Sequence, residues 1–394
     1  MDHAEPVDEV RQIMLQFADE TGLVSTRHPP RRYLWTDAHA VCNFLSLYVH
    51  TGDHEFTRLA CALIDQVHTV LGRHRDDDPR SGWISGLSES EGQDHPTVGG
   101  LRIGKKLNER GPHDVFDERL EWDRDGQYFH YLTKWMHALC RASEVTGEVK
   151  YCRCALELAK AAHAGFSAAG RGAVRRMHWK MSIDLSRPLV ASSGLHDPLD
   201  GYVTYNEIVQ CATRFPVDQM PAHLEAEIVE AAAMIEGQRW ETEDPLGIGG
   251  LLFDAWRVFQ LAVTRKKSFG ITAALVTSIK NSLATCAQTM DMRLPPEYRL
   301  AFRELGLSIG LHAVPSMWQL TAANPDLFSA TLRQDVGGLQ TYASAAAAIE
   351  SFWRDPHSQQ APSWREHRDI NSVMLATSLL PREFLGLGAS RRLR

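Results

Sequence analysis

The sequence predicts an all-α fold, an (α/α)6 toroid in which six helical hairpins close into a ring. Two observations carry this prediction. A direct repeat marks the turns of two helical hairpins, and twelve segments of the chain have the apolar spacing of helices. Strand-like alternation is confined to short pieces such as 201–204, which can equally begin a helix.

The repeat aligns residues 51–60 with residues 146–155, and both copies open with threonine, glycine and an acid. Apolar residues three and four positions apart follow each copy, as on one face of a helix. Glycine tolerates the left-handed backbone that ends a helix, and an acid favours the positive start of the next helix. Each copy is therefore the predicted turn of a helical hairpin.

The twelve segments divide into two kinds. Six are more uniformly apolar and are expected to form the inner helices, namely 35–49, 127–145, 200–213, 247–264, 306–321 and 367–381. Six are more amphipathic and are expected to form the outer helices, namely 6–20, 54–72, 148–167, 222–237, 271–290 and 325–353. Residues 73–126 form a long insertion after the first hairpin, and this uneven spacing favours a toroid over an open solenoid. We expect a single domain over residues 1–394.

Composition excludes several classes of protein. The net charge is −7 and the basic residues are scattered, which disfavours nucleic-acid binding. The first ten residues lack the basic and apolar pattern of a secretory signal, and no uninterrupted apolar run approaches ~18 residues. We therefore expect a cytoplasmic protein that does not bind a membrane. Seven cysteines without framework spacing indicate free, buried thiols, and no zinc motif is present, so no metal or other cofactor is expected.

Residues 32–38, with the sequence Arg-Tyr-Leu-Trp-Thr-Asp-Ala, continue into Leu47-Tyr48 and the turn at 51–53. On this stretch and the predicted architecture the chain resembles the six-hairpin glycosidase superfamily, and within it the N-acylglucosamine 2-epimerase group. The resemblance implies that the starts of the inner helices line a central pocket. It also implies that His367 holds the position of a catalytic histidine and that Arg32 clamps the substrate.

Polar residues gather at three of the expected inner-helix starts. In residues 118–130, Asp123 and Asp125 are candidate acid/base carboxylates. A nearby indole raises the pKa of a carboxyl group, whereas a nearby arginine lowers it, so one carboxyl group can act as acid while another stays ionised. Trp122, Tyr128 and His130 are the expected substrate contacts of this segment. A solvated charged loop that caps a helix is the alternative interpretation.

The second group, at residues 196–207, offers His196 and Asp200 as an acid/base unit and Tyr202 as a substrate contact, although its aspartates can equally cap a helix. The third group, at residues 364–371, offers Glu366 and His367 as catalytic residues and Trp364 as a substrate contact. At the first inner helix the expected substrate contacts are Trp35 and Asp37, together with Arg32.

Residues 99–105 have the glycine and lysine spacing of a phosphate-binding loop, but Lys106 stands where serine or threonine must hold magnesium. ATP hydrolysis is therefore not expected. Arg102 and Lys105 of this loop are candidates to bind a carboxylate or phosphate of the substrate.

The main functional hypothesis is a carbohydrate-active enzyme, a glycoside hydrolase that uses two carboxylates, Asp123 or Asp125 with Asp197, Asp200 or Glu366. The first alternative is a histidine-based sugar epimerase or isomerase, with His367 and either His196 or His130 exchanging protons. A terpenoid or peptide cyclase-like toroid and a non-catalytic toroid that binds a ligand or a protein partner are the others. The expected partner is a small molecule, a sugar or sugar derivative. The sequence does not decide whether the chain forms a homodimer.

Overall fold

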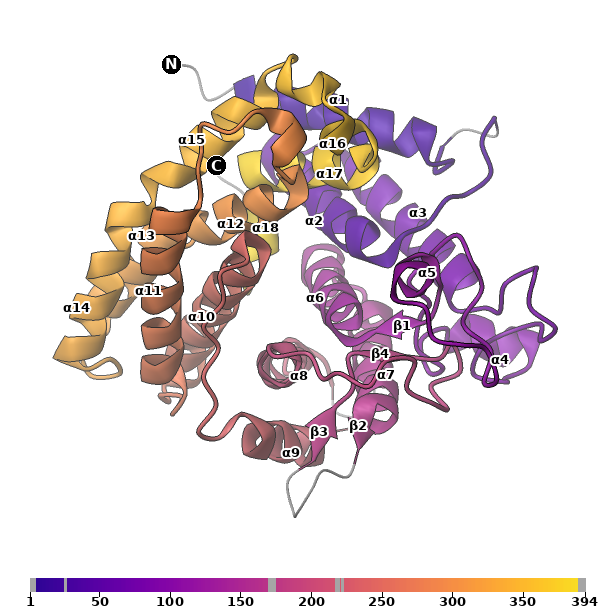
Figure 1. Ribbon diagram of the computed structural model, residues 1–394. Coiled ribbons are helices and arrows are strands. Elements are labelled where there is room, and N and C mark those ends of the chain that lie inside the picture. Colours follow the sequence, from indigo (N-terminus) through magenta and orange to yellow (C-terminus); the bar gives the residue numbers. More distant parts are fainter. Residues whose placement is uncertain (1–4, 25–26, 169–174, 217–219, 221–222, 389–394) are drawn as a thin grey trace. The chain divides into compact units, whose positions relative to one another are not determined.

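The computed structural model describes residues 5–24, 27–168, 175–216, 220 and 223–388. The chain forms two compact units, one of residues 16–236 and one of residues 1–15 with 237–394 (Figure 1). The first helix, α1 (Glu5–Glu20), contributes to both.

The described residues of the unit 16–236 form three helical hairpins. Their helices are α2 (Leu34–Thr51) with α3 (His54–Leu71), α6 (Phe129–Thr146) with α7 (Val149–Phe166), and α8 (Asp197–Ala212) with α9 (Glu225–Ile235). The first helix of each pair is more completely buried than the second: every residue of α2 from Leu34 to Leu47 is buried, whereas α3 buries one face. These are the predicted inner and outer helices.

The turns of the first two hairpins have the predicted geometry. Gly52 and Gly147 end α2 and α6 with φ of 72° and 79°, the left-handed conformation that glycine adopts without strain. Asp53 begins α3 by accepting a hydrogen bond from the Glu55 backbone N–H at 2.9 Å, while Glu148 makes no such side-chain cap for α7.

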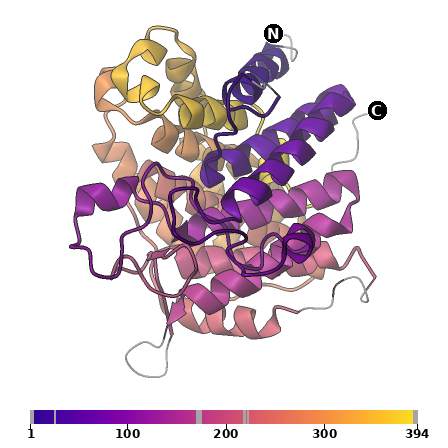
Figure 2. The ribbon, with the colours of Figure 1, turned by 90° about the vertical axis from the view of Figure 1, so that its right-hand side faces the viewer.

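The long segment between α3 and α6 contains two short helices, α4 (Glu89–Asp94) and α5 (Glu118–Asp123), joined by irregular chain (Figure 2). Its end pairs with a later loop, because β1 (Gln127–Tyr128) lies antiparallel to β4 (Lys180–Met181). A second two-stranded pair joins β2 (Ser167–Ala168) to β3 (Arg176–Met177).

The other unit contains the remaining hairpins. Its helices are α10 (Pro245–Arg265), α11 (Thr272–Thr289), α12 (Ala301–His312), α13 (Val314–Ala323), α14 (Ala330–Leu339), α15 (Ser344–Arg354), α16 (Pro362–Arg365), α17 (Arg368–Leu379) and α18 (Arg382–Leu385). Three short 3-10 turns lie at Pro296–Tyr298, Gln340–Tyr342 and Ser358–Gln360. Helices α10 and α12 approach closely, since a Cβ on Gly249 would lie 2.0 Å from the carbonyl oxygen of Gly306.

Two predicted helices are divided in the structure. The expected inner helix 306–321 breaks at Ala313, because Pro315 cannot donate the backbone hydrogen bond that a continuous helix requires. The expected outer helix 325–353 becomes α14 and α15, separated by the 3-10 turn at Gln340–Tyr342. Both divisions keep the predicted order of elements.

Helix α10 is long and apolar enough to cross a membrane, but 67% of its most apolar window is buried within the structure, as in a core helix. The seven cysteines are free, six of them buried and Cys61 partly buried.

Candidate functional site

The helices α2, α6 and α8 pack against one another in the order α2, α6, α8. Their first turns bring together three side chains far apart in the sequence. The rings of Trp35 and His130 lie 5.9 Å apart, and His130 Nδ1 lies 3.9 Å from Asp197 Oδ1. We call Trp35, His130, Asp197 and the adjacent tyrosines Tyr33 and Tyr131 the acid/base cluster.

His130 occupies an aromatic environment within this cluster. Its ring stacks on Tyr128 with centroids 5.6 Å apart and meets Tyr131 edge-on at 4.7 Å. Burial among these rings, followed by the charge of Lys134, lowers the pKa of His130 to about 4. The imidazole is therefore neutral at pH 7 and can accept a proton. Its side chain is 31% exposed, so a ligand can reach it.

Asp197 has the opposite electrostatic character. Burial, followed by the nearby charge of Asp200, raises the pKa of Asp197 to about 8. Its residue is 4% exposed and its Oδ2 atom has no hydrogen-bond partner in the described part of the chain. The carboxyl group is therefore mostly protonated at pH 7 and can donate a proton.

Asp200, three residues further along α8, is engaged differently. Its Oδ2 atom accepts hydrogen bonds from Lys134 Nζ at 2.8 Å and from Thr133 Oγ1 at 2.5 Å. The ion pair and hydrogen bond occupy this carboxylate, which is 4% exposed. Asp200 therefore holds the Lys134 ammonium group by an ion pair, and its predicted catalytic role stays a prediction.

A further buried pair lies one helical turn beyond, where His137 Nδ1 is 2.7 Å from Glu207 Oε1. The sequence reasoning missed Lys134 and His137, because the segment that forms α6 was expected to be uniformly apolar, whereas Glu207 of α8 lies in the polar group at residues 196–207. The available signal was the spacing of ionisable residues at 130, 134 and 137, which places them on one helix face. His39 of α2 is also buried there, and burial lowers its pKa to about 3.

The two tyrosines of the acid/base cluster contact each other, and a lysine lies beside one of them. The hydroxyl oxygens of Tyr33 and Tyr131 lie 2.7 Å apart and share a hydrogen bond. Lys105 Nζ lies 5.4 Å from the centre of the Tyr33 ring. Burial raises the pKa of Tyr33 to about 12, so this phenol stays protonated and available as a donor.

Asp125 belongs to an ion-pair network that fixes the insertion. Its Oδ2 atom accepts from Arg102 at 2.6 Å and from Arg75 at 3.3 Å, and its Oδ1 atom accepts from the backbone N–H groups of Gly104 and Gly126. Asp125 is fully buried. Both oxygens of the Asp125 carboxylate, and the guanidinium of Arg102, are therefore engaged in contacts that stabilise the insertion.

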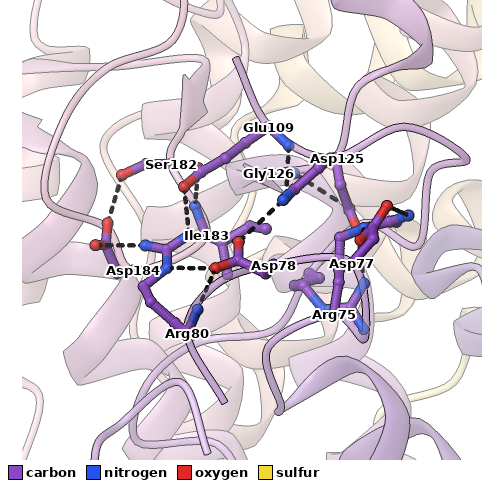
Figure 3. A network of polar contacts seen from close by, with 12 residues as sticks. Arg75, Asp77, Asp78, Arg80, Glu109, Asp125, Gly126, Ser182, Ile183 and Asp184 are labelled. Carbon is purple, nitrogen blue, oxygen red and sulfur yellow. Dashed lines mark hydrogen bonds and ion pairs between the residues drawn. The ribbon is translucent and has the colours of Figure 1, made fainter. Parts of the chain in front are cut away.

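The network continues through Arg80 (Figure 3). Its guanidinium donates to Asp78 at 2.9 Å, to Glu109 at 2.6 Å and to Asp184 at 2.8 Å. The other oxygen of Glu109 accepts from the backbone N–H of Ile183 at 2.6 Å. The insertion and the loop that follows β4 are therefore tied together by charge-assisted hydrogen bonds.

Trp122 and Asp123, at the end of α5, are exposed. The Trp122 ring contacts Trp179 edge-on at 5.4 Å, and Trp179 stacks on Tyr128 at 5.1 Å. Tyr128 is only 3% exposed and supports its neighbours, whereas Trp122 is 51% exposed and has an open ring surface. An aromatic chain thus runs from Trp122 to His130.

The other predicted residues of this unit shape the helix starts. Arg32 and Asp37 form a buried ion pair at 3.5 Å, and Asp37 also accepts from the Tyr33 backbone N–H at 2.9 Å. His196 is the residue before the first turn of α8, and it and Tyr202 are partly buried.

Three predicted residues lie in the other unit. Trp364 is buried and stacks on Trp353 with centroids 5.7 Å apart. Glu366 and His367 are exposed just before α17, and His367 contacts Phe302 edge-on. Their roles stay predictions.

In the described ranges, histidine, cysteine, aspartate and glutamate form no group of three or more that would hold a metal ion. The chemistry that the acid/base cluster supports by itself is proton transfer between a neutral imidazole and a protonated carboxyl group.

The arrangement of helices matches solved enzyme structures. An α-mannanase of glycoside hydrolase family 76 from Bacteroides thetaiotaomicron matches with a TM-score of 0.54 and 9% identity, covering 96% of this chain and 97% of that one. A D-mannose isomerase matches with a TM-score of 0.53 and 9% identity, covering 96% and 98%. An inactive α-1,6-mannanase from Salegentibacter, with two consecutive aspartates replaced and mannotetrose bound, matches with a TM-score of 0.53 and 10% identity, covering 97% and 100%.

These likenesses extend over nearly the whole chain and establish its fold. The chain has the all-α, (α/α)6 toroid fold that the sequence predicted. Comparison of the sequence with protein-family models and with curated proteins finds no match.

Proposed function

We propose that this protein is a carbohydrate-active enzyme that moves a proton within a sugar, as a histidine-based isomerase or epimerase. The observation that carries the proposal is the pairing of His130 with Asp197, which lie 3.9 Å apart and have opposite pKa shifts. Titratable neighbours whose environments push their pKa values apart supply the base and the acid of a proton-transfer reaction.

In this reaction His130 removes the proton from the carbon next to the sugar carbonyl, and Asp197 gives a proton to the carbonyl oxygen. The carbonyl oxygen gains negative charge as the carbon loses its proton. Helix α6 begins at Phe129 with no acidic residue in its first turn, so its positive end favours that charge. Tyr131, which is partly buried beside His130, provides a ring against which a sugar can pack.

Similarity in fold to a D-mannose isomerase and to a sugar epimerase from a ruminal bacterium supports this choice. The second of these has a TM-score of 0.50 at 9% identity.

Glycoside hydrolysis is the second candidate, favoured by the raised pKa of Asp197 and by the likeness to family 76 mannanases. A hydrolase needs a second carboxylate free to act as base or nucleophile. Asp125 and Asp200 are engaged in buried ion pairs. This chain has three consecutive aspartates, Asp76 to Asp78, that could also be considered as the second carboxylate. Two of them are engaged, because Arg75 forms an ion pair with Asp77 and Arg80 forms one with Asp78. Asp123 is exposed at the end of α5 and is not part of the acid/base cluster. We place proton transfer before hydrolysis because His130 and Asp197 already lie together at the starts of α6 and α8.

The test is solvent labelling. Mannose, glucose, fructose and cellobiose are each incubated with the protein in deuterated water, and deuterium next to the carbonyl carbon is followed by NMR. Labelling of at least one sugar is expected, with loss of about 10²-fold or more in rate for His130→Gln. His113→Gln, on an exposed histidine of the insertion, is the matched control and should keep the wild-type rate.

Absence of label in every sugar contradicts the proposal. Release of mannose from α-1,6-mannotetraose without labelling would favour the hydrolase instead, with Asp197→Asn abolishing release. If the wild-type protein neither labels a sugar nor releases mannose, a non-catalytic toroid would be favoured.

A further inference from the structure

The basic side chains near the acid/base cluster have carboxylate partners, with one exception. The pairs are Arg102 with Asp125, Lys134 with Asp200 and Lys180 with Glu121, at N–O distances of 2.6, 2.8 and 2.9 Å. Lys105 is the exception: within the part of the chain that the structure describes, its ammonium group makes no hydrogen bond or ion pair. Its contact is the face of the Tyr33 ring, 5.4 Å from Nζ.

The backbone holds Lys105 in this place. The carbonyl of Ile103 accepts from the Leu34 N–H at 3.1 Å, and the N–H of Gly104 donates to Asp125 at 3.0 Å. Arg75 donates to the carbonyl oxygen of Lys105 at 2.6 Å. Gly104 has φ of 91°, and a Cβ there would lie 2.2 Å from the carbonyl oxygen of Arg32. The segment is therefore fixed against the start of α2.

In the described ranges no carboxylate lies within ion-pair distance of the Lys105 ammonium group. Burial, followed by repulsion from Lys180, lowers the pKa of Lys105, while Asp123 and Asp125 act in the opposite direction. Asp123 is exposed, and Asp125 already accepts hydrogen bonds at both oxygens. A partly buried ammonium group without a carboxylate is costly, and an anionic ligand would remove that cost.

Neighbouring groups would also favour an anion. Tyr33, over whose ring Lys105 lies, immediately precedes the first turn of α2, and its hydroxyl shares a hydrogen bond with Tyr131. Helix α6 begins after Tyr128 with neither a side-chain cap nor an acidic residue in its first turn. Backbone N–H groups at a helix start and phenol hydroxyls are good donors to carboxylates and phosphates.

We propose that Lys105 binds an anionic group of the substrate, so that the enzyme acts on a sugar acid or a sugar phosphate rather than on a neutral sugar. This assignment rests on the proposed function for its sugar, but the anion site itself does not. The shared chemistry is a small oxyanion, and the two sources are distinguished by experiment.

The first experiment measures the reactivity of individual lysines in the wild-type protein. Trace reductive methylation is followed by mass spectrometry in chloride, inorganic phosphate or glycolate at constant ionic strength. An anion at ten times its dissociation constant should slow methylation of Lys105 about tenfold. Lys106, the exposed neighbour, is the internal control and should keep its rate. Protection by phosphate points to a sugar phosphate, and protection by glycolate to a sugar acid.

The second experiment compares the variants Lys105→Gln and Lys106→Gln. Calorimetry measures the binding of glucose 6-phosphate, glucuronate and glucose to each protein. Lys105→Gln should weaken binding of an anionic sugar about tenfold or more, with little change for glucose, and Lys106→Gln should change neither.

Absence of protection of Lys105 by both anions overturns the inference, and so does an unchanged preference for anionic sugars in Lys105→Gln. Failure of Lys105→Gln to fold leaves the methylation experiment decisive, since it uses the wild-type protein. Neither measurement requires turnover. Anion protection without solvent labelling would therefore refute only the proposed isomerase function, and labelling without anion protection would refute only the anion site.

Discussion

Replacement of Asp197 by asparagine tests the electrostatics of the acid/base cluster directly. The pKa of this carboxyl group rises from 3.8 to about 8 on folding, because the folded protein buries it beside Asp200. A raised pKa means that the folded protein binds a proton more tightly than the unfolded chain. The wild-type protein is therefore most stable below pH 4 with respect to this group, and loses stability as the pH rises toward 8.

The magnitude follows from the pH interval. Between pH 4 and pH 7 the unfolded chain has released the proton of Asp197 and the folded protein has kept it, so each unit costs about 1.36 kcal/mol. The free energy of unfolding of Asp197→Asn, relative to wild type, should therefore rise by about 4 kcal/mol over these three units. Steric and hydrogen-bonding effects of the substitution do not depend on pH and cancel from this comparison.

Urea unfolding followed by circular dichroism at pH 4, 5.5 and 7 provides the measurement. Asp200→Asn, on the same helix, is the comparison variant: it removes the partner of Lys134 and should destabilise the protein by about 3–5 kcal/mol. Because the charge of Asp200 helps to raise the pKa of Asp197, this variant should also weaken the pH dependence that Asp197 causes. Parallel pH dependences of wild type and Asp197→Asn would refute the burial argument and, with it, the assignment of Asp197 as a neutral acid.

Three further predictions follow from named contacts. The rate constant kcat/KM should rise with pH as His130 loses its proton near pH 4 and fall as Asp197 loses its proton near pH 8; a profile without the upper limb would exclude Asp197 as the acid. In the other unit, Glu304→Gln should cost about 3–5 kcal/mol in urea unfolding, because Arg299 stays buried without its partner at 2.6 Å, and a loss below about 1 kcal/mol would contradict this. Gly104→Ala should cost about 1–3 kcal/mol, since its φ of 91° strains alanine; an unchanged unfolding midpoint would be inconsistent with the observed backbone.

Much of the fold followed from local sequence patterns. The predicted inner helix 35–49 is α2 at Leu34–Thr51, and the outer helix 54–72 is α3 at His54–Leu71. Helical apolar spacing and helix-ending glycines act within a few residues, so a single sequence reveals them. The break at Ala313 was also encoded locally, in Pro315, but the apolar pattern across it was given more weight.

The candidate site was only partly predictable. His130 was expected as a substrate contact and, in the epimerase alternative, as one of two possible partners of His367 in proton exchange. Asp197 was expected as one of several carboxylates, whereas Lys134 was not considered at all. Asp125 was a candidate because it precedes an expected inner helix and Arg102 because it lies in a glycine-rich loop, and the structure pairs them with each other at 2.6 Å. The sequence does not distinguish a charged residue that binds a substrate from one that forms an ion pair, as Arg102 does with Asp125, 23 residues away.

The sequence by itself determined the order of the long helices and the turns of the first two hairpins, because turn glycines and apolar spacing are local properties. Only the tertiary structure decided which side chains can carry out chemistry. The pKa values of His130 and Asp197 depend on burial by residues of other helices, and the lack of a partner for Lys105 depends on which carboxylates other chain segments have already engaged. Desolvation and ion pairing are long-range in sequence, and they become defined only when the helices pack.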